Sequence, residues 1–343
     1  MISPPILRRA AAKDKRFRAA PVAPVRFPIK IKAMPAFIYY QFPLFPLVAA
    51  LGVAATLALA WATWNLRAAT LRAPLVWAWI AWLYLNYLGH GANKPSDYET
   101  YTAAVLSIAP LLAVLGAKRP QNGAWQFIVL TLVAVLLLPV GQGWAYGDAV
   151  PHVHGLFQWL IAAHILLAVA NYFATRFRGS ALVYAVGAVL SAGKFLPVLV
   201  DYGSAGVYWA LLCFPLSILG AAAIVWRSSR APSGLQHLWL DFRDAYGAVW
   251  ALRVAERLNA AARMHRWPVE FTWSGILVTD GANTTSSGNA RPSEAALEQL
   301  DPAVRHRVER ELRSLLRRFV SHEWIVKRLG SREVGVEVSG PRD

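Results

Sequence analysis

The sequence predicts an all-α integral membrane bundle of about seven transmembrane helices, followed by a small cytoplasmic α+β tail. Three observations predict this class. The composition is 56% hydrophobic and only 16% charged, long apolar stretches recur along the chain, and cations gather in alternate connections. Soluble domains carry about 25% charged residues, so the composition favours a membrane protein. The fifteen Trp and twelve Tyr fit a protein with two lipid–water boundaries.

The first element is a basic, Pro/Ala-rich tail over residues 1–36. Residues 1–33 hold nine Lys or Arg and one Asp, which is half of the net charge of +16. The tail has no apolar core, so it is not a secretory signal. We expect either a disordered extension or a mis-assigned start, with translation beginning at Met34.

Seven stretches follow that are long and apolar enough to span a bilayer. A hydrocarbon core about 30 Å thick needs about 17–25 mainly apolar residues per helix. The predicted spans cover residues 42–64, 73–89, 101–117, 125–146, 157–175, 181–200 and 207–226. Several contain Pro, which is tolerated in lipid where neighbouring helices satisfy the freed carbonyls. The stretch 73–89 is short, and without it six spans remain, with both ends inside.

Charges in the connections predict the orientation. Cations occupy the first, third and fifth connections and follow the last span, at Arg67, Arg72, Lys118, Arg119, Arg176, Arg178, Arg227 and Arg230. The even connections and the end of the sixth span hold Asp97, Glu99, Asp148 and Asp201, with Lys94 as their one cation. Lys and Arg near span ends favour the cytoplasm. We therefore expect a protein of the bacterial inner membrane with its N-terminus outside and its C-terminus cytoplasmic. The cations of residues 1–33 oppose this, but most lie too far from the first span to count.

Residues 232–343 form the predicted tail domain. Residues 235–264 read as a long helix, which either packs against the tail or lies in the membrane interface. Its apolar stripe contains Leu238, Phe242, Ala245, Val249, Leu252, Ala255, Leu258 and Ala262. Alternation predicts strands over 269–278 and 333–339 that pair with each other. A linker covers 280–292, and a second helix runs from Pro302, after Asp301, to Gly330.

Three stretches carry a resemblance to a known group. They are "LGAKRPQNGAW" (115–125), "FRDAYGAVWALRVAERLNAAA" (242–262) and "LLRRFVSHEWIVKRLG" (315–330). The chain after about Met34 resembles an uncharacterised group of bacterial multi-pass membrane proteins. The resemblance implies a membrane fold and no particular activity.

Few residues suggest chemistry, because the familiar catalytic motifs are missing. Lys194 is the one cation inside a predicted span, and Asp201 lies two helical turns further on, so the two are a candidate intramembrane ion pair. A packing or snorkelling lysine is the alternative.

Histidines near the outer boundary are the candidate metal ligands. His90, His152 and His154 lie near acids, and imidazoles with carboxylates bind transition metals. His164 is a possible axial ligand of a haem. Hydrogen bonding to lipid headgroups is the alternative. The single Cys213 excludes an intrachain disulfide and a cysteine-based metal cluster.

These features predict a membrane anchor or scaffold that recruits a cytoplasmic protein through residues 232–343, rather than an enzyme. The predicted partners are the lipid bilayer and that protein, with no nucleic acid, since Glu309 and Glu311 interrupt the basic face of 305–318. No cofactor is predicted. The alternative is a transporter or a metal or haem redox protein that uses the outer His and acid cluster and Lys194.

Overall fold

The computed structural model describes residues 44–91, 95–118, 121–196, 205–229, 233–279 and 292–330. Several predictions fall outside this part: the tail 1–36 with Met34, almost all of the linker 280–292, and the strand 333–339. In the described residues the chain is mostly helical, with a small two-stranded sheet in its C-terminal part.

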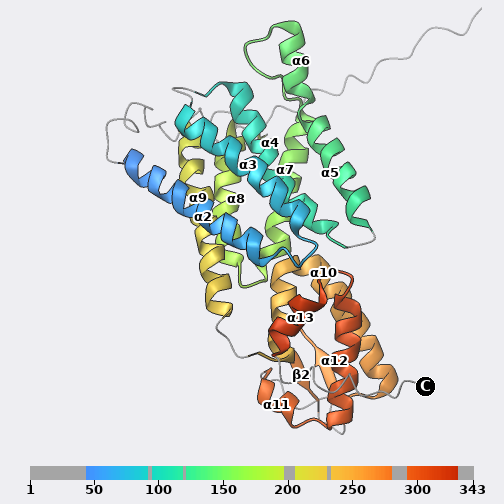
Figure 1. Cartoon of the computed structure of the whole chain (residues 1–343). Coiled ribbons are helices and arrows are strands. Elements are labelled where there is room, and N and C mark those ends of the chain that lie inside the picture. The colour runs from blue at the N-terminus through green and yellow to red at the C-terminus, as the bar shows by residue number, and fades with distance from the viewer. Residues whose placement is uncertain are drawn as a thin grey trace, which may run out of the picture. The chain divides into compact units, whose positions relative to one another are not determined.

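A helical bundle forms from residues 44–228 (Figure 1). Its elements are α2 (Leu44–Asn65), α3 (Arg72–Gly91), α4 (Asp97–Leu115), α5 (Asn122–Leu136), α6 (Leu138–Tyr146), α7 (Gly155–Phe173), α8 (Arg178–Ala192), the 3₁₀ turn η2 (Gly193–Phe195) and α9 (Ala205–Ser228). The central helix is α4, which contacts α3, α5, α7 and α8. Small side chains such as Ala104, Ala109 and Ala113 are fully buried there and let the neighbouring helices approach closely.

Five helical segments in the described residues are long and apolar enough to cross a membrane. They are Pro46–Asn65, Asp97–Leu115, Asn122–Tyr146, Gly155–Phe173 and Tyr208–Ser228. Of the other two predicted spans, α8 is short, with 15 residues, and α3 has 20 residues but a more polar composition. The candidate spans indicate a membrane location.

The exposed apolar side chains agree with that location. Large apolar residues lie exposed along the bundle helices, for example Leu57, Phe127 and Leu166, each at least 66% exposed. Among the described residues of the C-terminal part, only Leu252 and Met264 are exposed large apolar side chains. A soluble surface rarely carries an apolar area that extends over so many helices, whereas lipid tails cover such a surface.

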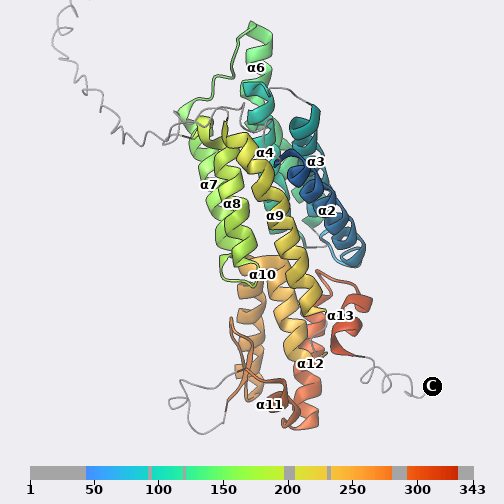
Figure 2. The same ribbon diagram turned by 90° about the vertical axis from the view of Figure 1, so that its left-hand side faces the viewer.

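Two span boundaries differ from the prediction for local reasons. The predicted span 101–117 begins earlier, because Ser96 and Glu99 form a capping box at the start of α4. The span 125–146 is divided at Leu137, just before Pro139, and α6 continues from there. Figures 1 and 2 both show α6 at the end of the bundle remote from α12.

The C-terminal part packs around one long helix, α10 (Leu235–His265), with its own apolar core. Around it lie β1 (Val269–Phe271), β2 (Ile276–Val278), α11 (Glu294–Glu298), α12 (Pro302–Leu316) and α13 (His322–Leu329). The long helix therefore packs against the rest of the tail, which was one of the two positions predicted for it. The core also includes Ala69 and Ala117 from bundle connections, and the tail and the bundle belong to one compact unit, Ala33–Asp343.

The predicted apolar stripe of α10 is wrong in its middle. Gly247 has φ 74° and ψ −172°, so the helix is kinked there. The kink changes which side chains face inward. Tyr246, Trp250 and Val254 are buried, whereas Leu252 is 59% exposed.

The strand predicted over 269–278 is a hairpin instead. β1 and β2 pair antiparallel, with Val269 opposite Val278 and Phe271 opposite Ile276. The Thr272 N–H donates to the Gly275 carbonyl at 2.8 Å and closes the turn between them. Gly275, at φ 150°, adopts a conformation that L residues rarely reach.

The predicted helix from Pro302 to Gly330 is divided in two. Its start is confirmed, since the Asp301 carboxylate accepts from the Ala303 N–H at 2.8 Å. It breaks between α12 and α13, where Val320 pairs with Ala69 and Ser321 caps the new helix.

Candidate functional site

Three bundle connections meet the tail at one junction. In the first, the Thr70 N–H donates to the Phe319 carbonyl at 2.9 Å, and the Ser321 N–H donates to the Ala68 carbonyl at 2.8 Å. In the second, between α4 and α5, Lys118 Nζ lies 6.0 Å from the centroid of the Trp250 ring, whose indole N–H donates to the carbonyl of Val114 in the last turn of α4 at 3.4 Å. In the third, between α7 and α8, the carbonyl of Ala174 accepts from the Trp273 indole. Counted along the predicted spans, these are the first, third and fifth connections, so all three contact the tail.

Tyr246 lies at the centre of this junction. Its hydroxyl donates to the Phe319 carbonyl at 2.7 Å and lies 3.1 Å from the Thr70 hydroxyl, which donates to the Ala117 carbonyl. The phenol is fully buried, so these partners replace water. The stretches 115–125, 242–262 and 315–330, which carry the resemblance, thus meet in one place.

The predicted cytoplasmic markers lie on these connections. Arg67 lies in the first connection and Arg72 begins α3, Lys118 follows α4, and Arg176 lies between α7 and α8, which Arg178 begins. Arg119 lies outside the described residues. The cations thus gather at the end of the bundle that holds the tail, while the side of the membrane that this end faces stays a prediction.

Asp241 of α10 is the hub of an ionic network at the junction. Its Oδ1 accepts from Arg176 Nη2 at 2.7 Å and from the Ser228 hydroxyl at 2.9 Å, and its Oδ2 accepts from Arg328 Nε at 2.8 Å. His237 Nε2 lies 3.3 Å from the same Oδ2. One carboxylate thereby joins the α7–α8 connection, the end of α9, and α13.

Asp244 extends the network by one helical turn. Its side chain is 2% exposed and pairs with Arg176 and with Arg243, whose Nη2 lies 2.7 Å from Oδ1. Arg243 also donates to the Trp273 carbonyl. Buried acids are stable only when paired and hydrogen-bonded, and these two meet that requirement.

The network shifts the pKa values of its members. Burial alone would raise the pKa of Asp241, but Arg328, His237, Arg176 and Ser228 together hold it below its ordinary value. Burial lowers the pKa of His237, which outweighs the opposite effect of Asp241. At neutral pH the Asp241 carboxylate is therefore ionised and the His237 imidazole is uncharged.

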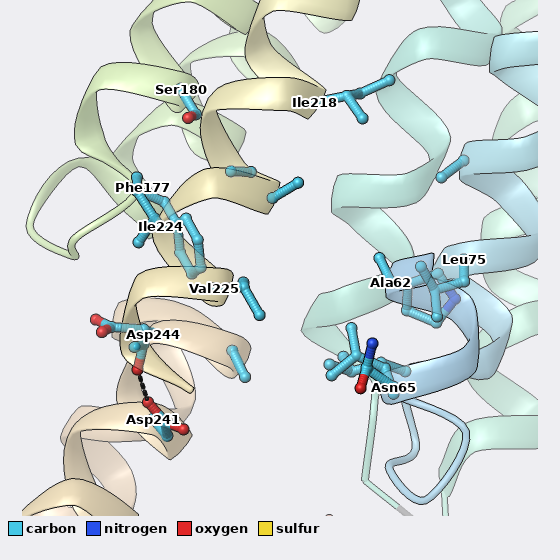
Figure 3. A pocket seen from close by; sticks show the side chains of 18 of the residues that line it. Ala62, Asn65, Leu75, Phe177, Ser180, Ile218, Ile224, Val225, Asp241 and Asp244 are labelled. Atoms are coloured by element: carbon cyan, nitrogen blue, oxygen red, sulfur yellow. Dashed lines mark hydrogen bonds between the residues drawn. The ribbon is translucent and has the colours of Figure 1, made fainter. Parts of the chain in front are cut away.

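A cavity of about 560 Å³ opens beside this network. Its walls come from α2, α3, α4, α7, α8 and α9 and its floor from α10 and α13. Figure 3 shows Ile218 and Val225 of α9 on one side of the space and Ala62 and Asn65 of α2 on the other, with Asp241 near the bottom. The volume lies within the roughly 300–1,000 Å³ of ordinary ligand pockets.

The cavity is apolar along its length and charged at one end. Its lining is mostly Ala, Leu, Val, Ile and aromatic residues. The charged lining residues are the cations Arg67, Arg176, Lys327 and Arg328 and the acids Asp241, Asp244 and Glu323. All of them lie near the junction, so the cavity matches an elongated amphipathic molecule.

Lys194 has an acidic partner among the described residues, Asp97. Its Nζ lies 2.5 Å from Asp97 Oδ2, at the start of α4. The helix ends in η2 at this position, so the lysine lies at the end of the bundle remote from the tail. Asp201 lies outside the described residues, and the predicted Lys194–Asp201 pair is untested.

The histidines give no metal site in the described part of the chain. His152 Nε2 lies 3.5 Å from Asp148 Oδ2 and is 65% exposed, and the side chain of His154 does not cap α7. The side chain of His90 is not among those that the structure describes. His164 Nδ1 contacts the Leu160 carbonyl of its own helix. No group of three His, Cys, Asp or Glu with metal-binding geometry occurs among the described side chains, and the predicted site stays a prediction.

Sequence reasoning missed the acids of the junction. Asp241 and Asp244 look like solvated residues of an amphipathic helix, and their partners Arg176 and Arg328 lie 65–87 positions away. The sequence did hold one signal of this network. Asp244 and Arg328 lie in two of the stretches that carry the resemblance, 242–262 and 315–330.

Comparison with known proteins identifies no relative. No family model, curated protein or solved structure matches the chain. The resemblance to a bacterial group therefore stays a prediction, and the function must be argued from the geometry.

Proposed function

We propose that the chain is an inner-membrane protein with seven spans, an outside N-terminus and a cytoplasmic tail. Besides the five apolar candidates, α3 has 20 residues and extends about 30 Å. The 15 residues of α8 and the 3 of η2 extend roughly 28 Å together. Both lengths match a hydrocarbon core of about 30 Å. The shared position of the three odd connections and the tail supports the orientation, because those connections carry the cations.

In this arrangement the protein acts as a membrane scaffold whose tail recruits a cytoplasmic protein. The observation that carries this proposal is the Asp241 network together with the separate contacts that three bundle connections make with the tail, which hold the tail in one position. A surface held in place loses less conformational entropy on binding than a loose extension does.

Proximity labelling in the native cell tests the scaffold role. A labelling enzyme is fused to the C-terminus of the full chain and of a chain whose residues 233–343 are replaced by an unrelated soluble domain. We expect cytoplasmic neighbours that are enriched only with the native tail, while both chains insert equally. The same neighbours with both chains would contradict recruitment by the tail.

A second candidate is a transporter or a metal or haem redox protein, favoured by the Lys194–Asp97 pair and by His152 beside Asp148. The visible spectrum and metal content of the purified protein test its redox form. A Soret band, or a bound metal that is lost from the His152→Ala/His154→Ala chain, would favour this candidate. A protein with neither would contradict the redox form and leave the scaffold or a metal-free transporter.

A further inference from the structure

We propose that the junction cavity binds one anionic phospholipid of the cytoplasmic leaflet. Its acyl chains lie between α2 and α9, and its phosphate lies at Arg67 and Lys327. This inference rests on the proposed orientation of the chain but not on the scaffold role.

The apolar part of the cavity fits acyl chains. Ala62 of α2 and Ile218, Ala221 and Val225 of α9 line its walls, as Figure 3 shows for three of them. These helices contact each other, so the space lies inside a bundle whose outer surface is itself apolar. An acyl chain gains the same free energy of burial there as in the bilayer and also contacts closely packed walls.

The charged end of the cavity fits an anion. Arg176 and Arg328 are already paired with Asp241 and Asp244. In contrast, Arg67 and Lys327 are exposed and have no acidic partner within 4 Å among the described side chains. Arg67 lies 4.2 Å from the ring of Trp64, which also lines the cavity. Glu323 is the opposing charge at this rim, and the cations still outnumber the acids.

The charged end of the cavity lies at the membrane depth expected for a lipid headgroup. It lies where the bundle meets the tail, beside Trp61 and Trp64, and tryptophans mark the lipid–water boundary. Basic pockets between transmembrane helices on the cytoplasmic side bind anionic headgroups. A zwitterionic lipid lacks the net charge that the rim cations would pair with.

Thermal unfolding of the full chain in lipid nanodiscs tests the proposal. We expect phosphatidylglycerol, titrated into a phosphatidylcholine disc, to raise the unfolding temperature with saturation at a low mole fraction. Equal stabilisation by both lipids would overturn the proposal, because it would reflect the bilayer as a whole. Stabilisation in pure phosphatidylcholine discs by inorganic phosphate alone, to the same extent, would also overturn it and assign the site to a free anion.

Two variants with matched controls locate the site. Arg67→Gln/Lys327→Gln should weaken the phosphatidylglycerol effect roughly tenfold in half-saturating mole fraction, whereas Arg310→Gln/Arg317→Gln, at exposed cations outside the cavity, should leave it unchanged. Ala221→Phe should fill the acyl space and abolish saturation, and Ala223→Phe, on the exposed side of α9, should not. Variants that fold and respond like the wild type would contradict this location.

Discussion

Asp241 shows how a single residue can decide whether the tail stays attached to the bundle. Its carboxylate is 12% exposed and accepts from both Arg176 and Arg328. Replacing it by Ala leaves Arg328 without its acid and Arg176 with Asp244 alone, in a poorly solvated place, which costs about 2–4 kcal/mol after allowance for the partial exposure of Arg176. Thermal unfolding of the purified protein should show a lower midpoint. Glu270→Ala, at an exposed carboxylate of β1, should leave the midpoint unchanged, and an Asp241→Ala midpoint equal to that of Glu270→Ala would contradict this role.

His237 makes the same junction sensitive to pH. Its pKa in the folded protein lies below the ordinary 6.5, because burial disfavours the charged imidazole. The unfolded chain therefore binds a proton more readily, and stability falls as the pH drops below about 6.5. The lowered pKa of Asp241 acts in the same direction, in more acid solution below its ordinary 3.8.

Unfolding midpoints measured between pH 7.5 and 5 check this linkage. We expect the wild-type midpoint to fall toward pH 5 and the His237→Asn midpoint to fall less, because Asn does not titrate. His322→Asn, at an exposed position, is the control and should follow the wild type. The pH dependence would need another origin if His237→Asn also followed the wild type.

At the scale of elements, the kink in α10 joins the tail to α7. A kink leaves backbone groups without helical partners, and two side chains of α7 satisfy them. Asn171 accepts from the Val249 N–H at 3.1 Å, and the Tyr172 hydroxyl donates to the Ala245 carbonyl at 3.3 Å. The backbone of Gly247 is in a region that only Gly adopts readily.

Gly247→Ala tests the importance of this kink. A Cβ at Gly247 would lie 2.3 Å from the Asn171 side chain and in a strained backbone conformation. We expect a loss of about 2–4 kcal/mol in unfolding free energy, from strain and from displacement of Asn171. Gly155→Ala, where a Cβ meets open space, is the control and should change little. A Gly247→Ala chain as stable as this control would show that α10 can straighten.

The elements also show what periodicity can predict. Apolar length identified the bundle helices, and Asp301 followed by Pro302 identified the start of α12. The kink at Gly247, the turn at Gly275 and the break at Val320 were missed, because each depends on contacts with distant residues. Asn171 accepts a hydrogen bond at the kink, the Gln236 side chain accepts from the Ile276 N–H next to the turn, and Ala69 pairs with Val320 at the break. A helical or alternating pattern continues through such positions without a sign of them.

On the scale of the whole molecule, the positive connections and the tail converge on one end of the bundle. The sequence predicted which connections carry cations but not that the tail would bind all three of them. The arginine partners Arg176 and Arg328 lie 65–87 positions along the chain from Asp241 and Asp244. Orientation can thus be argued from local charge, whereas the junction and its cavity required the folded chain.

Cysteine labelling on intact spheroplasts tests the orientation most directly. In a Cys213→Ser background, single cysteines replace Ala149, Gln121 or Ser314, all exposed positions. With a membrane-impermeant maleimide, the account predicts that Ala149→Cys reacts in intact spheroplasts. Gln121→Cys and Ser314→Cys should react only after the membrane is permeabilised. Labelling of Gln121→Cys or Ser314→Cys in intact spheroplasts would contradict a cytoplasmic junction, and with it the scaffold and the site for a cytoplasmic-leaflet lipid.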